Sequence, residues 1–139
     1  AQGKLDGIKV FGCDGLDGLQ TKVSDMTMLE GVMMLTPFAV DAPDTKTQTF
    51  VDKFTKLHGS APDQFAADAY DAVYAVKAAM EACGKTPADA DFTSAMVDAM
   101  YNITVDGLTG NMKWDATREP DKNAKAMVFA ADGTTSLLG

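Results

Sequence analysis

The chain has 139 residues and a formal net charge of −8, and 46% of its residues are hydrophobic. That hydrophobic content supports a folded core and excludes a disordered chain, and the length suits about one domain. The negative charge, with no run of Lys or Arg, excludes a nucleic-acid partner, and no apolar stretch reaches the ~18 residues of a membrane span.

The N-terminal part combines a turn, a short strand and a glycine-rich loop. Gln2, Gly3 and Gly7 favour a turn, and a chain that opens on a turn before a core strand is expected to be a fragment whose preceding helix lies upstream. Residues 8–11 are β-branched or aromatic apart from one Lys, which predicts a strand. The glycines of residues 12–20 indicate a sharply bending loop at the end of that strand.

This loop carries two carboxylates, Asp14 and Asp17, among its glycines. The alternation of Asp and Gly allows a calcium site as an interpretation. However, the spacing and the terminal Glu of an EF-hand are absent, and a calcium-binding nonapeptide repeat would need several copies of the pattern. We therefore expect no metal site and no cofactor.

The next segment leads into a second strand. Residues 22–28 predict a short, weak helix or turn, and residues 32–35 (VMML) form a continuous apolar run. An apolar run buried on both faces is typical of a central parallel strand. Residues 38–43 then form a linker.

Three helices are predicted in the middle of the chain. Asp44 can cap the first, which runs to Leu57 with Phe50, Val51, Phe54 and Leu57 on one face and Gly59 as its stop. The third covers about residues 89–101, with Phe92, Ala95, Met96, Ala99 and Met100 facing inward.

The second helix, at residues 62–84, is the longest helical pattern in the sequence. Pro62 suits its first turn and Gly84 its left-handed end, and its interior is rich in Ala. Small and apolar residues recur at steps of three and four, which predicts one buried face: Phe65, Ala69, Ala72, Val73, Val76, Met80 and Cys83.

The C-terminal part is predicted to be strands and turns. Strands are expected at residues 108–114, 126–130 and 134–138, with turns at 115–125 and 132–133. Strands at both ends and helices between them predict an α/β fold class.

The few cysteines and the single histidine argue against an enzyme. Cys13 and Cys83 lie in no CxxC motif and are expected to be unpaired, buried, small hydrophobic residues. His58 falls in the last turn of a predicted helix, where a cation interacts well with the helix dipole. Without a second His, a reactive Ser context or a phosphate loop, we expect no catalytic site.

Four segments in order resemble a known family, the type I periplasmic substrate-binding proteins of branched-chain amino acid ABC transporters. The segments are IKVFGCDGL, LEGVMMLTPF, PDQFAADAYDAVYAVKAAMEACG, and VDGLTGNMKWD followed by AKAMVFAADG. The resemblance covers only the C-terminal part of such a protein. It implies two α/β lobes that close on a ligand, with residues 1–37 in the second lobe, 38–117 in the first, and 118–139 returning to the second.

The resemblance assigns two ligand-binding residues. Asp14 stands where amino-acid-binding members place the acidic residue that holds the ligand's α-amino group, and Gly12 and Gly15 are expected to let the backbone approach the ligand. The alternative is that Asp14 is a solvated turn residue. Phe65 stands where leucine-binding members place an aromatic residue near the ligand's side chain, and the alternative is a core residue on the helix face.

The resemblance implies a non-enzymatic receptor for an apolar amino acid that delivers its ligand to a membrane permease. Such a receptor is periplasmic or extracellular, and a lipid anchor on the longer protein is part of the expectation. A ligand-sensing domain of a signalling receptor shares this fold and remains the alternative. Because strands 8–11 and 32–35 lack their expected neighbours, the chain is also expected to self-associate.

Overall fold

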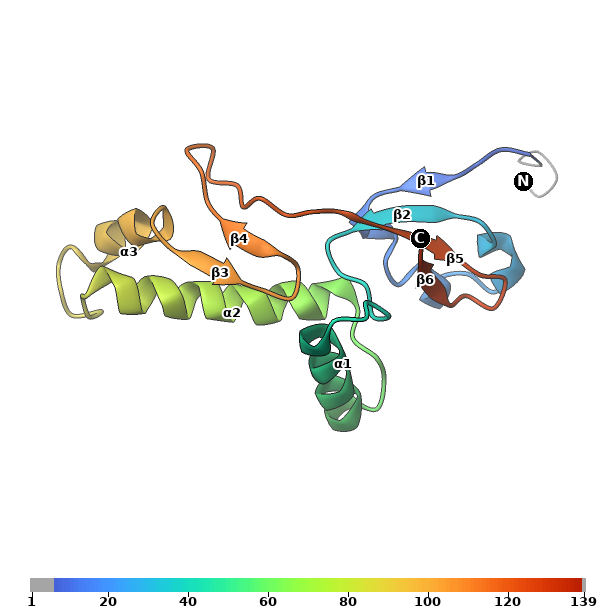
Figure 1. The fold of residues 1–139 in the computed structure, drawn as a ribbon, viewed down its shortest axis with the longest axis horizontal. Coiled ribbons are helices and arrows are strands. Elements are labelled where there is room, and N and C mark those ends of the chain that lie inside the picture. Colours follow the sequence, from blue (N-terminus) through green and yellow to red (C-terminus); the bar gives the residue numbers. More distant parts are fainter. Residues whose placement is uncertain (1–6, 139) are drawn as a thin grey trace. The chain divides into compact units, whose positions relative to one another are not determined.

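The computed structural model describes residues 7–138, so the turn predicted around Gln2 and Gly3 lies outside the described residues. The chain divides into two compact units, unit 1 with residues 1–64 and 124–139 and unit 2 with residues 65–123 (Figure 1). Within the described range the chain forms three α-helices, a four-stranded sheet and a two-stranded sheet. The predicted α/β class is confirmed.

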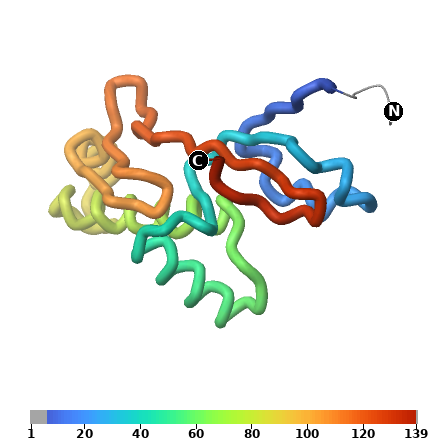
Figure 2. Tube along the Cα trace, turned by 45° about the vertical axis from the view of Figure 1, so that its right-hand side comes forward, coloured from blue at the N-terminus to red at the C-terminus, as the bar shows by residue number. Residues whose placement is uncertain are grey.

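Unit 1 is built on the four-stranded sheet, in the order β1-β2-β5-β6. Its strands are β1 (Phe11–Gly12), β2 (Met33–Thr36), β5 (Lys125–Phe129) and β6 (Thr135–Leu137). β1 is parallel to β2, and the other two pairs are antiparallel. Figure 2 shows the cyan β2 beside the red C-terminal strands, so segments from opposite ends of the chain share one sheet.

Two predictions about this sheet are wrong in part. β1 is shorter than the strand expected at residues 8–11, since only Phe11 and Gly12 are paired with β2. β2 is central, but it has one parallel and one antiparallel neighbour, and its side chains alternate between buried and more exposed positions. Leu35 is 54% exposed because only one face of β2 packs on the core, on the side of Met34 and Thr36.

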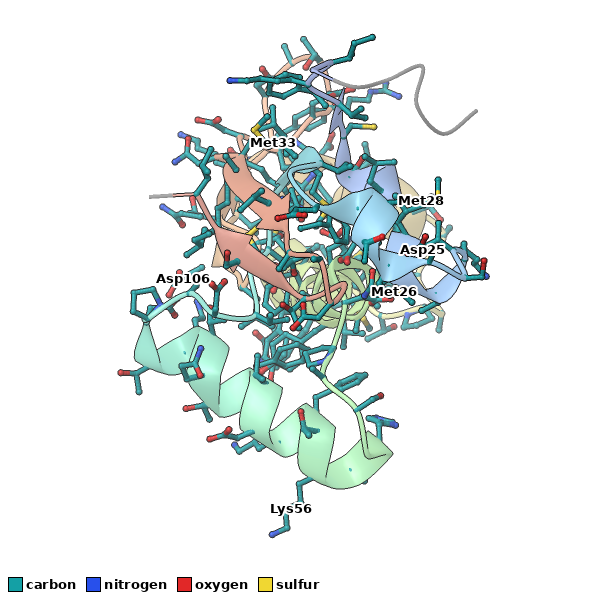
Figure 3. The ribbon with its side chains drawn as sticks, turned by 90° about the vertical axis from the view of Figure 1, so that its right-hand side faces the viewer. Asp25, Met26, Met28, Met33, Lys56 and Asp106 are labelled. Carbon is teal, nitrogen blue, oxygen red and sulfur yellow. The ribbon has the colours of Figure 1, made fainter. Side chains whose placement is uncertain are left out.

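The core of unit 1 lies against that buried face. Its members are Leu29, Val32, Met34, Ala39, Ala42, Met127 and Phe129. The 3₁₀ helix η3 (Met26–Leu29) covers one side of this core and replaces the weak helix expected at residues 22–28. Asp25 caps η3 by accepting a hydrogen bond from Thr27 N–H at 3.1 Å. Figure 3 labels Asp25 together with Met26 and Met28 of η3.

Helix α1 (Thr45–His58) confirms the prediction of a capped helix. Asp44 accepts a hydrogen bond from Thr47 N–H at 2.8 Å, and Gly59 ends the helix with φ of 80°. Burial raises the pKa of the Asp44 carboxyl, but the hydrogen bonds from Thr47 outweigh it and hold the pKa below its usual value. Leu57 was expected on the buried face and is instead exposed, since the buried residue of α1, Thr47, lies at the opposite end of the helix.

Unit 2 combines two helices with a hairpin. Its elements are α2 (Gln64–Cys83, of which all but Gln64 belongs to unit 2), α3 (Phe92–Met100), β3 (Thr104–Asp106) and β4 (Asn111–Lys113). β3 pairs antiparallel with β4, and the sequence-based strand at 108–114 therefore merged a turn with β4 and missed β3. The core of this unit contains Ala75, Ala79, Ala99, Ile103, Val105 and Met112.

The long helix is correctly predicted, but its buried face is not. The buried residues of α2 are Gln64, Ala67, Asp71, Ala75 and Ala79. The larger apolar residues of the predicted face are exposed, including Val73 at 67%, Val76 and Met80. The reason is that the hairpin and α3 pack on the alanine side, where small side chains allow close approach. Figure 1 shows the hairpin and α3 beside α2.

Candidate ligand-binding site

Asp14 lies in a tight turn directly after the first strand. It is the first residue of the 3₁₀ helix η1 (Asp14–Leu16), and Leu16 N–H donates to the Cys13 carbonyl oxygen at 3.0 Å. The Asp14 side chain is exposed, and in the part of the chain that the structure describes nothing forms a hydrogen bond or ion pair with its carboxylate. A carboxylate in this state can accept charge-assisted hydrogen bonds from an ammonium group.

Gly12 shapes this turn in a way that the sequence did not predict. A Cβ at position 12 would lie 3.4 Å from Leu16 Cδ2 and closer still to the rest of that side chain. Leu16 in turn packs against the core of unit 1. Gly12 therefore makes room for Leu16, whereas Gly15 has open space around it, since a Cβ at position 15 would meet no atom within 4 Å.

The backbone of the Asp14 turn is held by the first residue of α2. Gln64 Nε2–H donates to the Asp14 carbonyl oxygen at 3.2 Å, and Gln64 N–H donates to Asp17 Oδ2 at 2.7 Å. Asp17 N–H also donates to the Asp14 carbonyl oxygen, at 2.9 Å. Sequence reasoning missed Gln64, although a polar residue on the same helical face as alanines was a signal that it is buried and bonded.

Phe65 follows Gln64 as the second residue of α2 and belongs to unit 2, whereas Asp14 belongs to unit 1. Phe65 is 52% exposed, so it is not a core residue in the described part of the chain. An exposed aromatic ring offers apolar area that a ligand side chain can cover. The alternative interpretation of Phe65 as a core residue is thereby disfavoured.

A second polar cluster lies inside unit 2. Asp71 is 2% exposed, and its carboxylate accepts hydrogen bonds from Leu108 N–H at 2.8 Å, Thr109 N–H at 2.8 Å and the Thr109 hydroxyl at 2.7 Å. Gly107 is required beside it, since a Cβ there would lie 2.7 Å from Asp71 Cγ. Both positions belong to the segments that resemble the family, but the sequence predicted no role for them.

The other candidate groups form no site. Cys13 is exposed and Cys83 is half-buried, and both are free thiols, so Cys13 is not the buried residue that was expected. His58 lies in the last turn of α1 with its ring centroid 4.3 Å from that of Phe54. Among residues 7–138 no three His, Cys, Asp or Glu side chains are grouped to hold a metal ion, and none of the described helices is long and apolar enough to cross a membrane.

Comparison with known proteins identifies one family and several solved structures of similar fold. A family model described as periplasmic binding protein matches residues 1–134. A solute-binding protein of an ABC transporter from R. palustris, in complex with benzoate, is 24% identical with a TM-score of 0.76, over 96% of this chain and 36% of that chain. No protein with a curated description matches the chain.

Two further solved structures have amino acids in their names. The branched-chain amino acid transporter substrate-binding protein LivJ from Streptococcus pneumoniae, in complex with isoleucine, is 21% identical with a TM-score of 0.75, over 99% of this chain and 39% of that chain. An ABC transporter substrate-binding protein from Desulfitobacterium hafniense, in complex with Leu, is 24% identical with a TM-score of 0.70, over 95% of this chain and 36% of that chain.

These likenesses show the fold, and the chain spans little more than a third of the length of the structures it matches. The family model, by contrast, matches nearly all of the chain. The resemblance inferred from the sequence is confirmed, and the chain belongs to the periplasmic binding protein family.

Proposed function

We propose that this chain is part of a solute-binding receptor of an ABC transporter, and that Asp14 anchors the ammonium group of an apolar amino acid. The observation that carries the proposal is the Asp14 carboxylate, which is exposed and unpaired within the described residues while its backbone is fixed by Gln64. The names of the similar structures supply two ligand classes, amino acids and benzoate. Benzoate has no ammonium group, so a free carboxylate favours the amino acids.

The rest of the receptor follows from the same proposal. Phe65 contributes apolar contact to the ligand side chain, and closure of two lobes around the ligand completes the site. The receptor works outside the cytoplasm and passes its ligand to a membrane permease, without enzymatic activity. A lipid anchor and pairing of the 139-residue chain with a second copy stay predictions, which mass spectrometry of the membrane fraction and sedimentation velocity can test.

Calorimetry on the complete gene product tests the role of Asp14, with L-leucine, L-isoleucine and benzoate as ligands. We expect Asp14→Ala to weaken leucine binding by about 2–5 kcal/mol, which is thirtyfold or more, because the ammonium enclosed by lobe closure loses its charged partner. Asp14→Asn should also weaken binding, since the amide keeps the shape and loses the charge. Phe65→Ala should weaken binding of leucine more than that of alanine.

Asp52→Ala is the matched control, because it removes another exposed aspartate of unit 1, on α1, and leaves the Asp14 turn intact. Its affinity for leucine should equal that of the unmodified protein. Leucine binding that survives Asp14→Ala unchanged would show that Asp14 is a turn residue. Binding of benzoate in preference to leucine would assign the receptor to aromatic carboxylates.

A further inference from the structure

Gln64 is a fully buried polar residue whose side-chain amide joins two separate segments of unit 1. Its exposed fraction is 0%. The Nε2 group donates to the Asp14 carbonyl oxygen at 3.2 Å. Oε1 lies 3.0 Å from the Thr36 hydroxyl, whose single proton it shares as an acceptor with the Phe38 carbonyl oxygen at 3.1 Å. The orientation of the amide is fixed chemically, because a carbonyl oxygen can only accept and must therefore face the NH₂ group.

Three hydrogen bonds close a ring between Asp14, Asp17 and Gln64. The Asp14 carbonyl oxygen accepts from both Gln64 Nε2–H and Asp17 N–H, and Asp17 Oδ2 accepts from Gln64 N–H at 2.7 Å. Gln64 is the first residue of α2, so its N–H has no partner within the helix. The Asp17 carboxylate satisfies this N–H and also interacts favourably with the positive end of the helix dipole.

The ring is tied to the sheet through Thr36, the last residue of β2. Thr36 is 1% exposed, and its hydroxyl also accepts from Phe38 N–H at 3.2 Å. Phe38 and Gln64 are both buried, so water does not compete for these hydrogen bonds. Asp14 is exposed, and within the described residues its carboxylate forms no hydrogen bond, whereas its carbonyl oxygen accepts two.

We propose that Gln64 and Asp17 are positioning residues for Asp14. They hold the Asp14 turn in one conformation, so that its backbone does not have to become ordered when the carboxylate binds a ligand ammonium. Binding groups that are ordered in advance spare the entropy of ordering on association. The inference rests on the proposed role of Asp14 and goes beyond it, because it assigns ligand selectivity to two residues that act through the backbone of the Asp14 turn.

The test measures selectivity in the complete gene product, since selectivity separates positioning from general stability. The probes are L-leucine and 4-methylpentanoate, which is leucine without its amino group. The readout, from competition calorimetry, is the dissociation constant of 4-methylpentanoate divided by that of L-leucine. We expect Gln64→Leu and Asp17→Ala each to lower this ratio about tenfold, because a misplaced carboxylate loses affinity for the ammonium and nothing else. In Asp17→Asn the ratio should lie within about twofold of that of the unmodified protein, since the amide oxygen can still accept from Gln64 N–H.

Gln48→Leu is the matched control. Gln48 is another glutamine of unit 1, half-buried where Gln64 is fully buried, and its Nε2 donates to the carbonyl oxygens of Val40 at 3.0 Å and Ala42 at 2.8 Å. The ratio should stay unchanged in this variant even where thermal stability falls. Asp17→Ala serves as the decisive variant if Gln64→Leu does not fold.

The outcomes separate the two proposals. If Asp14→Ala lowers the ratio but Asp17→Ala does not, or if Gln48→Leu lowers it as much, the positioning role is overturned and Asp14 keeps its own. If Asp14→Ala leaves the ratio unchanged, or if leucine does not bind the unmodified protein, the proposed function itself has failed. A fall in Gln64→Leu and Asp17→Ala, with rescue by Asp17→Asn, supports the inference.

Discussion

Helix α2 carries two buried polar side chains on one face, and they bond different kinds of partner. Gln64 at its start joins the Asp14 turn to the end of β2 within unit 1. Asp71, two turns later in unit 2, gathers three donors from Leu108 and Thr109. The first is a neutral amide and the second is a carboxylate, which within the described residues has no Lys or Arg as an ion-pair partner.

The difference follows from what each group can bond. A carboxylate only accepts, so it is suited to a turn that presents several N–H and O–H groups at once, as residues 107–109 do. An amide both donates and accepts, so it can link a carbonyl oxygen of one segment to a hydroxyl of another. All three hydrogen bonds of the Asp71 carboxylate go to one turn, residues 107–109, whereas the Gln64 amide bonds two different segments. Loss of the Asp71 carboxylate should therefore cost more stability than loss of the Gln64 amide.

Replacement of Asp71 should have the largest effect on folding. In Asp71→Ala, the N–H groups of Leu108 and Thr109 and the Thr109 hydroxyl are left buried without an acceptor. We expect a loss of about 3–5 kcal/mol in the free energy of unfolding, measured by urea denaturation. Asp71→Asn keeps one acceptor oxygen and the volume, and should lose less. A loss below about 1 kcal/mol in Asp71→Ala would mean that water satisfies these donors.

Gly107→Ala tests the same cluster through its packing. The added Cβ would lie 2.7 Å from Asp71 Cγ and 2.8 Å from Met112 Cε, and Asp71 cannot move without breaking its hydrogen bonds. We expect a loss of about 1–3 kcal/mol in the free energy of unfolding. Gly15→Ala is the control, because its Cβ would meet nothing within 4 Å. Equal melting temperatures for the two variants would contradict the close packing at Gly107.

The smallest loss of stability is expected at Asp44, a capping carboxylate that is exposed to solvent. Its comparison with the buried Asp71 shows how much burial increases the cost of removing a hydrogen-bonded carboxylate. Asp44→Ala should cost about 1 kcal/mol through loss of the cap, and Asn should retain most of it. Since the hydrogen bonds from Thr47 hold the pKa of Asp44 below its usual value, its charge stabilises the fold above about pH 4, and this contribution is lost as the pH falls through the folded-state pKa.

Thermal unfolding between about pH 5 and pH 2.5 measures that contribution as the difference between the unmodified protein and Asp44→Asn. The unmodified protein should lose more stability on acidification than the variant does. The comparison isolates Asp44 from Asp89, Asp115 and Asp132, whose pKa values are also lowered by hydrogen bonds within their own turns. Parallel curves for the two proteins would contradict the charge contribution.

The sequence by itself determined the features that depend on neighbouring residues. Helix α1 was predicted with its cap and its stop, because Asp44 and Gly59 act within a few residues of themselves. The turn at residues 132–133 and the strands on either side of it were found for the same reason. The order of segments was enough to indicate the family, and Asp14 and Phe65 came from that resemblance.

Tertiary structure alone decided which faces are buried and which polar groups meet. The apolar stripe of α2 predicted the wrong face, because the alanine side admits the hairpin and α3 while Val73 and Val76 remain exposed in the described chain. No local pattern joins Gln64 to Asp14 or Asp71 to Thr109, since hydrogen bonds between residues so distant in sequence exist only after the chain has folded. Periodicity records that a helix has two faces, and packing selects between them.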